Sequence, residues 1–255
     1  MSTPVLEATG IVKRYGKFTA VNGVDLRVMP GTIHSVIGPN GAGKTTLFHT
    51  LTGTTPLTAG RILINGEDVS QLPAFKRVGK GLARSFQVTS LFLKLSVREN
   101  LRLAAQGRAP AQAFSPWTLA ESLHPACDTA QRLLQQLGLA GVAERPASEL
   151  SHGQQRRLEV GMAMAAEPRV IFLDEPTSGM GIDDIGEMKQ LIRGLRERYT
   201  VVLIEHNMDI VMDISDRITV MQLGQVLVEG RPGDIRQDPR VRQAYLGGMI
   251  TGGAA

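Results

Sequence analysis

The spacing of apolar positions changes along the chain and divides it into segments of different character. Residues 5–29 mix β-branched and polar residues, and turn signals at 15–17 and 22–23 predict an antiparallel meander. Residues 90–167 instead show helical periodicity, and 96–99 has the form of a capping box at a helix start. The rest of the chain alternates short apolar strands with helices. This alternation predicts a mainly parallel α/β sheet with a helical insertion.

The predicted elements alternate on both sides of the helical insertion. The predicted strands are 32–37, 61–64, 170–173, 201–204, 217–221 and 225–228. The predicted helices are 44–51, 127–137, 154–166, 183–198 and 207–214. Residues 106–125 contain three prolines and the only tryptophan, and form either a loop or a short broken helix. Because the length suits one core with a small attached subdomain, we expect 1–255 to be a single domain with 90–167 as its inserted helical subdomain.

Composition and charge narrow the class of protein. With 42% hydrophobic and 20% charged residues, the chain has the composition of an ordinary soluble globular protein. No apolar run approaches the ~20 residues that span a bilayer, and residues 1–4 lack the features of a signal peptide. The single cysteine, Cys127, cannot form an internal disulfide, so we expect a cytoplasmic location. The net charge of +4 is spread along the chain, which favours an anionic membrane face or a nucleotide over nucleic acid.

A glycine-rich run between a predicted strand and a predicted helix is the first candidate for chemistry. It fits the pattern G-x-x-x-x-G-K-[ST] and consists of Gly38, Pro39, Asn40, Gly41, Ala42, Gly43, Lys44 and Thr45. Glycines let backbone N–H groups wrap phosphates, and the dipole of the following helix adds favourable charge. We expect Lys44 to reach the β- and γ-phosphates of a nucleotide, Thr45 to ligate Mg²⁺, and Thr46 to belong to the same site. The structural alternative is a glycine-rich turn without a ligand.

The predicted strand 170–173 ends in two carboxylates, Asp174 and Glu175. In open α/β sheets, ligands bind at the carboxyl ends of the strands, so this pair should lie beside the phosphate-binding loop. Asp174 suits a Mg²⁺ ion, normally through a water molecule, and Glu175 can polarise an attacking water as a general base. Apolar strands that end in an acidic residue are common, and the preceding glycine-rich loop is what favours the functional interpretation.

The run Leu-Ser-His-Gly-Gln at 150–154 resembles the signature of the ATP-binding cassette (ABC) ATPases. In that family the signature of one subunit completes the nucleotide site of a second subunit, so the resemblance implies a dimer. Ser151, Gly153 and Gln154 would then present N–H groups and a hydroxyl to a γ-phosphate from a helix start. An ordinary serine-capped helix start is the alternative. Most family members have glycine where His152 stands, a departure that we expect to affect the dimer rather than the serine and glycine contacts.

Further positions match the lesser motifs of the same family. Gln87 resembles the glutamine that contacts Mg²⁺ or the attacking water, and His206 resembles the switch histidine that bonds the γ-phosphate. Tyr15 stands where an aromatic side chain stacks on adenine. Residues 178–183 hold the place of the D-loop at the dimer seam but depart from its usual Ser-x-Leu-Asp form. Taken singly, each of these side chains would more often be structural.

The resemblance covers residues 15–246 and implies the fold of a P-loop NTPase. The implied fold is α/β, with a RecA-like core, an N-terminal antiparallel β meander and an inserted α-helical subdomain. Finer features resemble the cassettes of branched-chain amino acid importers and their amide or urea relatives; they lie at 81–87, 156–160, 204–208 and 245–247. The resemblance therefore implies an ATPase that uses ATP and Mg²⁺ to power a membrane importer.

Partners and location follow from the same resemblance. A second cassette subunit, identical or different, would complete the dimer, and transmembrane permease subunits and indirectly an external solute-binding protein would complete the transporter. The cassette would lie on the inner face of the plasma membrane. The apolar residues Leu91, Phe92, Leu93 and Leu95 are either core of the helical lobe or part of a groove that accepts a short permease helix.

Three other functions compete with this interpretation. A lipopolysaccharide-type exporter cassette has a similar length and layout. A soluble ABC protein of DNA repair or translation would usually carry long coiled-coil insertions or two cassettes, and this chain shows neither. A P-loop kinase or GTPase would leave the signature unexplained, and the guanine-reading motif Asn-Lys-x-Asp is absent from the sequence.

Overall fold

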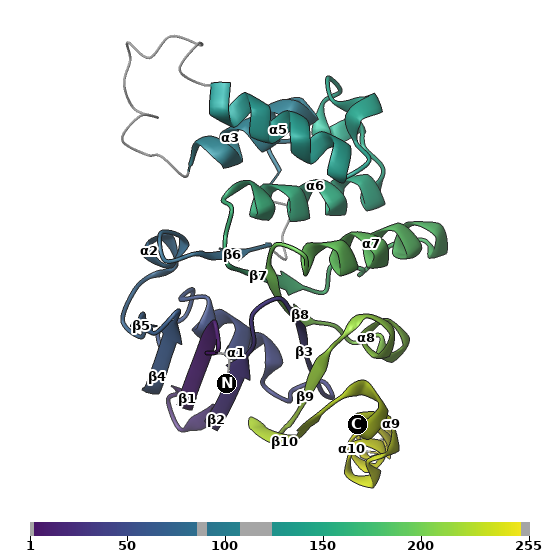
Figure 1. The fold of residues 1–255 in the computed structure, drawn as a ribbon. Helices are drawn as coiled ribbons and strands as arrows, with labels where there is room; N and C mark the ends of the chain where they lie inside the picture. The colour runs from purple at the N-terminus through teal and green to yellow at the C-terminus, as the bar shows by residue number, and fades with distance from the viewer. Residues whose placement is uncertain (1–2, 86–90, 108–123, 251–255) are drawn as a thin grey trace.

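The computed structural model describes residues 3–85, 91–107 and 124–250, in which two sheets are flanked by helices (Figure 1). The first sheet has the order β2-β1-β4-β5, and all of its pairs are antiparallel. Its strands are β1 (Leu6–Tyr15), β2 (Phe18–Val28), β4 (Ala59–Ile64) and β5 (Glu67–Asp68). The predicted N-terminal antiparallel arrangement is therefore confirmed.

One predicted turn in this sheet is wrong. Asn22 and Gly23 lie inside β2, where Ile11 pairs with Val24 and Val12 pairs with Asn22. Gly23 is therefore an extra residue on one strand, which is a β-bulge, and its φ of 68° explains why glycine stands there. Asn22 and Gly23 do form a local irregularity in the backbone, but β2 continues to pair with β1 on both sides of it.

The second sheet has six strands in the order β10-β9-β3-β8-β7-β6. Its strands are β3 (Ile33–Ile37), β6 (Leu82–Arg84), β7 (Val170–Asp174), β8 (Thr200–Ile204), β9 (Arg217–Gln222) and β10 (Gln225–Gly230). Only β9 and β10 pair antiparallel, so the predicted mainly parallel sheet is confirmed. The strands β3, β7 and β8 are buried along their whole length. Burial on both faces explains why they have continuous apolar runs instead of alternation.

Helices cover this sheet, and three of the described α-helices, α3, α5 and α6, come between β6 and β7 in the sequence. The helices are α1 (Lys44–Leu51), α2 (Ala74–Val78), α3 (Val97–Gln106), α5 (His124–Gln136), α6 (His152–Ala165), α7 (Ile182–Leu195), α8 (Met208–Ile214), α9 (Pro232–Gln237) and α10 (Pro239–Ile250), with short 3-10 turns at Ala140–Val142 and Ala147–Glu149. The sequence analysis did not predict α2, β6, α9 or α10. In the part of the chain that the structure describes, no helix is long and apolar enough to cross a bilayer.

Helices α3, α5 and α6 pack together in one lobe, at the top of Figure 1. The helices approach closely at Gly161 of α6, where a Cβ atom would lie 2.2 Å from Leu137 and 3.0 Å from Leu101. The predicted capping box at the start of α3 is only half formed. Ser96 accepts a hydrogen bond from the N–H of Glu99, but the Glu99 carboxylate bonds Arg102 instead of the cap.

Helix α1 lies between the two sheets and positions the glycine-rich loop that precedes it. Leu47, Phe48 and Leu51 are buried, and the Phe48 ring meets Phe172 of β7 edge-on at 5.2 Å between centroids. The far end of α1 is held by Arg77, a fully buried side chain whose guanidinium donates to the carbonyls of Thr50 and Leu51. The buried face and the C-terminal end of the helix are therefore held in place, and its N-terminus follows the loop at the carboxyl end of β3.

Candidate active site

The loop that joins β3 to α1 fits only because of its glycines. Gly38 and Gly43 have φ angles of 151° and 97°. A Cβ atom on Gly38 would lie 2.2 Å from the carbonyl oxygen of Met221 in β9, and one on Gly43 would lie 2.5 Å from that of Ala20 in β2. The loop is therefore confined between strands of both sheets, and its backbone is brought to the surface without side chains in the way.

The loop presents a cluster of free hydrogen-bond donors. Among the residues that the structure describes, none accepts a bond from the backbone N–H groups of Gly41, Gly43, Lys44, Thr45 or Thr46, and Gly43 offers no side chain to cap α1. The Lys44 ammonium folds back over the loop and donates to the carbonyls of Gly38 at 2.7 Å and Pro39 at 3.0 Å. Unpaired N–H groups at a helix start, next to a cation, form an anion site that suits phosphate.

Asp174 is the last residue of β7, and its carboxylate is buried without a hydrogen-bond partner in the described part of the chain. The residue is 3% exposed, and neither carboxylate oxygen has a hydrogen-bond partner in the described part of the chain. Burial raises the pKa of Asp174 to about 6; Glu175 and Glu205 also raise this pKa, whereas Arg84 and Lys44 lower it. Buried polar groups are normally paired, so this carboxylate has the properties expected of a ligand for a cation or its bound water.

Glu175 follows directly and adopts an unusual backbone conformation. Its φ is 48°, in the left-handed region, and its N–H donates to the carbonyl of Ile204 in β8 at 2.9 Å. Oε1 of Glu175 lies 3.7 Å from Nδ1 of His206, whose side chain is 61% exposed. Burial lowers the pKa of Lys44, an effect opposed by Glu175 and Asp174. The structure thus brings Lys44, Asp174, Glu175 and His206 together at the carboxyl ends of β3, β7 and β8, where open α/β sheets bind ligands.

Of the two remaining predicted residues of the nucleotide site, the structure describes only Tyr15. Tyr15 ends β1 at the β1–β2 hairpin, is half exposed, and has the Lys13 ammonium 4.8 Å from its ring centre. Its ring is thus open to stacking on a flat ligand. Gln87 lies outside the described residues.

The start of α6 carries the signature residues on a surface of its own. Ser151 accepts a hydrogen bond from the N–H of Gln154 at 3.2 Å, and its own N–H donates to Oε1 of Gln154 at 3.0 Å, which forms a complete capping box. Within one subunit these two side chains therefore satisfy each other. Helix α6 packs on α3, α5 and α7, in the lobe opposite α1 (Figure 1).

The signature also contacts the residues that follow Glu175 in the same chain. Nε2–H of His152 donates to the carbonyl of Ser178 at 3.2 Å, and a Cβ on Gly179 would lie 3.2 Å from this ring nitrogen. A Cβ on Gly153 would lie 2.3 Å from the carboxyl carbon of Asp184. The start of α6 and the start of α7 are therefore in direct contact, and a side chain at position 153 would displace the carboxylate of Asp184.

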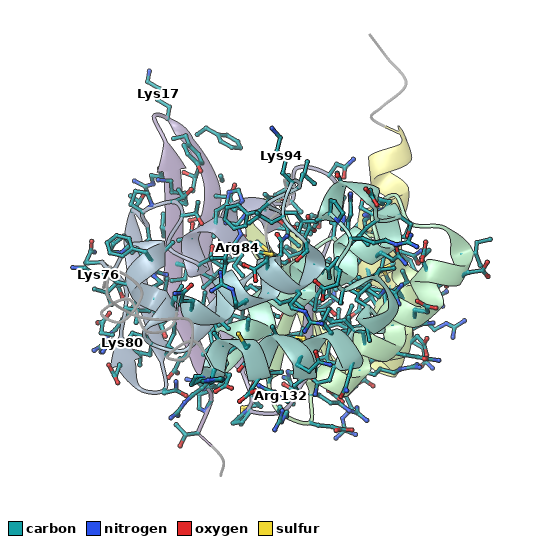
Figure 2. All side chains as sticks on the ribbon, turned by 90° about the horizontal axis from the view of Figure 1, so that it is seen from above. Lys17, Lys76, Lys80, Arg84, Lys94 and Arg132 are labelled. Atoms are coloured by element: carbon teal, nitrogen blue, oxygen red, sulfur yellow. The ribbon has the colours of Figure 1, made fainter. Side chains whose placement is uncertain are left out.

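Sequence reasoning missed two charged residues at the site. Arg84 of β6 influences Asp174 electrostatically and lies over the Phe48 ring, 5.1 Å from its centre. Figure 2 shows Arg84 in the middle of the molecule, whereas Lys17, Lys76 and Lys80 lie at its edge. Glu205 is fully buried at the end of β8. The only signal for Glu205 in the sequence was a charged residue directly after a continuous apolar strand.

Comparisons with known proteins agree with these motifs. The ABC transporter family model matches residues 21–178, and the model of the branched-chain amino acid ATP-binding cassette transporters matches residues 225–249. The chain is 43% identical to the high-affinity branched-chain amino acid transport ATP-binding protein BraF of Pseudomonas aeruginosa and 41% identical to LivG of Escherichia coli; each match covers 97% of this chain and 99% of the relative. The crystal structure of MJ1267, an ATP-binding cassette of an ABC transporter in its ADP conformation, superimposes with a TM-score of 0.86 at 30% identity and covers 96% of this chain and all of that one.

Proposed function

The chain belongs to the ABC transporter family and is an ATPase of the cassette type, and we propose that it powers an importer of branched-chain amino acids or related small amino acids and amides. The observation that carries the catalytic part is the cluster of Lys44, Asp174, Glu175 and His206 beside a loop of free N–H groups. The solute class is supported by the functions named for BraF and LivG and by the family match at 225–249.

In this proposal each residue of the cluster has a defined task. The free N–H groups of the loop bind the phosphates of ATP, and Lys44 exchanges its two loop carbonyls for phosphate oxygens. Mg²⁺, when bound, would neutralise charge on the β- and γ-phosphates, and we expect Thr45, Asp174 and Gln87 to hold it. The unpaired oxygens of Asp174 fit that task.

Glu175 and His206 act at the reacting end of the nucleotide. Glu175 accepts the proton of the water that attacks the γ-phosphate, and it is placed for this by its left-handed backbone. His206 donates a hydrogen bond to a γ-phosphate oxygen, and its exposed ring is free to do so. Tyr15 stacks on the adenine ring.

A second cassette subunit completes the site. Ser151 and Gly153 lie in a different lobe from the loop that holds the phosphates, so they serve the nucleotide of a partner subunit rather than their own. The inserted helical subdomain, 90–167, carries them. The partner is a second copy of this chain or a related cassette, and the assembly lies on the inner face of the plasma membrane.

An apolar groove between the two lobes is the proposed docking site for the permease. A cavity of about 460 Å³ is lined on one side by Phe75, Val78 and Leu82 and on the other by Met162 and Ala163 of α6. Phe75 is 73% exposed, so its ring is available to a partner. A short amphipathic helix of a permease subunit would cover these residues by the helix-in-groove mode. Through the permease, the cassette would also be linked to an external solute-binding protein.

The two interpretations of the apolar run after Gln87 each account for part of it. Leu91 is buried in the core of the helical lobe, so it is structural. Phe92 is 52% exposed, and Leu93 and Leu95 are also exposed, so these side chains are available to a partner. Phe92 does not line the groove described above, so we assign it to a second, separate contact surface for the permease, and we assign Leu91 to the core.

Glu175→Gln tests the proposed chemistry. The amide cannot accept the proton, so phosphate release should fall about 10²–10⁴-fold while ATP affinity is retained. Lys44→Ala should instead weaken ATP binding. The matched control is Glu197→Gln, a change at an exposed position near the end of α7, which should leave both quantities unchanged. Near-normal hydrolysis by Glu175→Gln would overturn the assignment of the base.

The composite site is tested by the oligomeric state. Light scattering should show Glu175→Gln as a monomer without nucleotide and as a dimer with Mg²⁺ and ATP. A persistent monomer at high concentration would count against it. Mixing subunits that carry Lys44→Ala with subunits that carry Ser151→Ala should restore one competent site per heterodimer.

Phe92→Asp tests the docking surface. Basal ATPase activity and melting temperature should stay close to those of the unmodified chain, whereas permease binding and solute uptake should be lost. Leu91→Asp is the contrast, since a charge in the core should unfold the lobe. A large fall in melting temperature for Phe92→Asp would place that residue in the core as well.

A further inference from the structure

Glu205 is a fully buried acidic residue at the end of β8, between Ile204 and His206. Its Oε1 accepts hydrogen bonds from the N–H of Thr177 at 3.1 Å and from the Thr177 hydroxyl at 2.5 Å. Its Oε2 accepts the N–H of His206 at 3.2 Å. A buried carboxylate is unfavourable unless its oxygens are satisfied. Here the donors come from two separate loops, and each loop carries a residue of the proposed site.

The first loop contains Glu175, whose backbone needs support. A φ of 48° is unfavourable for any residue with a Cβ atom, so the conformation persists only when its surroundings hold it. Two hydrogen bonds hold it locally: the N–H of Glu175 donates to Ile204 at 2.9 Å, and the N–H of Ser178 donates back to the Glu175 carbonyl at 3.1 Å. Glu205 adds a third point of attachment at Thr177. The turn is therefore fastened to two consecutive residues at the end of β8.

The second loop contains His206, whose ring has little packing of its own. Because 61% of this side chain is exposed, contacts with neighbouring side chains cannot fix its position. Its backbone N–H, however, is bonded to the same carboxylate that holds Thr177. Nδ1 of His206 lies 3.7 Å from Oε1 of Glu175. This separation depends on the backbone of both loops, and the carboxylate of Glu205 holds both by hydrogen bonds.

We propose that Glu205 is a positioning residue, which fixes Glu175 and His206 relative to each other by bonding both of their loops. This inference rests on the proposed function, because that function gives Glu175 and His206 their tasks. A carboxylate is required because both oxygens face donors. Glutamine has only one oxygen and would place its NH₂ group against an N–H or O–H donor, so one loop would be released.

Glu205→Gln should therefore impair the chemical step more than substrate binding. We expect kcat for ATP hydrolysis to fall about 10–100-fold, since small misplacements of reacting groups have effects of this size. KM for ATP should change less than about threefold, because the hydrogen bonds that Glu205 accepts in the described part of the chain come from Thr177 and His206 and not from the phosphate-binding loop. A residue that only supports the fold would lower the melting temperature and the active fraction without this split between kcat and KM.

Thr177 provides the matched pair of variants. Thr177→Val removes the hydroxyl donor but keeps the backbone bond, and should lower kcat several-fold. Thr177→Ser keeps the hydroxyl and should restore kcat to near the unmodified value. Combining Thr177→Val with Glu205→Gln should reduce kcat by less than the product of the two separate effects, because residues in one hydrogen-bond network are not additive.

The outcomes separate this inference from the proposed function. If Glu175→Gln abolishes hydrolysis but Glu205→Gln and Thr177→Val have normal kcat, Glu205 is not a positioning residue and the proposed function stands. If Glu175→Gln hydrolyses ATP normally, the proposed site is wrong and the role of Glu205 is overturned with it. If Glu205→Gln fails to fold, the Thr177 pair decides, and an equal loss in the Val and Ser variants would overturn the inference.

Discussion

Replacing Asp174 by asparagine should make the nucleotide-free protein more stable, although it removes a residue of the proposed site. Burial raises the pKa of this carboxyl from 3.8 to about 6. That change corresponds to about 3 kcal/mol by which the fold disfavours the charged form at neutral pH. Asparagine has nearly the same shape without the charge. Its amide would still be buried without partners, which costs about 1–2 kcal/mol, so we expect a net gain of about 1–2 kcal/mol.

The gain should depend on pH in a direction that follows from the pKa. The pKa of Asp174 is higher in the folded state than in the unfolded state, so the folded state binds more protons between about pH 4 and pH 6. The stability that this group contributes is present below the unfolded pKa and is lost as the pH rises through about 6. The advantage of Asp174→Asn should therefore be largest above about pH 6 and should be almost completely lost at about pH 5, because the electrostatic cost of the carboxylate has then fallen to about 1.5 kcal/mol and the cost of the buried amide offsets it.

Thermal unfolding without Mg²⁺ and nucleotide measures this effect. A gain of 1 kcal/mol corresponds to about 2–4 °C in a protein of this size, so Asp174→Asn should melt about 2–8 °C higher at neutral pH. Asp128→Asn, an exposed change on α5, is the control and should have no effect. Mg²⁺ with ATP should then stabilise the unmodified chain much more than the variant. A variant that is less stable at neutral pH, or an advantage that does not shrink on acidification, would refute the reasoning.

Three further changes have defined outcomes. Arg77→Met removes hydrogen bonds to two buried carbonyls, of Thr50 and Leu51, and to two partly buried ones. It should lower the free energy of unfolding in urea by about 3–5 kcal/mol, and a loss below about 1 kcal/mol would contradict the anchoring role. Gly38→Ala places a methyl group 2.2 Å from a β9 carbonyl and should abolish ATP binding, whereas Gly141→Ala, which meets nothing within 4 Å, should not. His152→Gly removes one hydrogen bond, between the start of α6 and the carbonyl of Ser178. In the Glu175→Gln background it should weaken ATP-dependent dimerisation about threefold to tenfold, as seen by light scattering, and unchanged dimerisation would dismiss the contact.

Local residue patterns were sufficient for the central strands and the phosphate-binding loop. The runs at 170–173 and 201–204 are apolar throughout because β7 and β8 are covered on both faces, and that requirement is visible in the residues themselves. The helix at 44–51 follows directly from the glycines and Lys44 that precede it or begin it. Placing Asp174 beside Lys44 needed only the rule that parallel strands end on one edge of their sheet.

Local patterns failed where a distant partner decides the structure. The strand β6 is three residues long and exists because Leu82 and Ala83 pair with Val170 and Ile171 of β7. The Asn22-Gly23 pair predicts a turn from its own conformational preference, but the register with β1 makes it a bulge. In both cases the local structure is decided by pairing with a second strand. A short window of sequence does not contain that second strand, so it cannot predict the pairing.

The chain order alone thus determined which chemical groups are available, because the glycine-rich loop, the acidic pair and the signature are contiguous runs whose chemistry is local. Only the tertiary structure decided how those groups are tuned. The raised pKa of Asp174 results from burial by residues of several elements. The hydrogen bonds that Thr177 donates to Glu205 join residues that are 28 positions apart in the sequence. They form because β7 and β8 lie side by side in the sheet. Burial and long-range hydrogen bonds depend on the packed strands and helices, and so they exist only once the whole fold has formed.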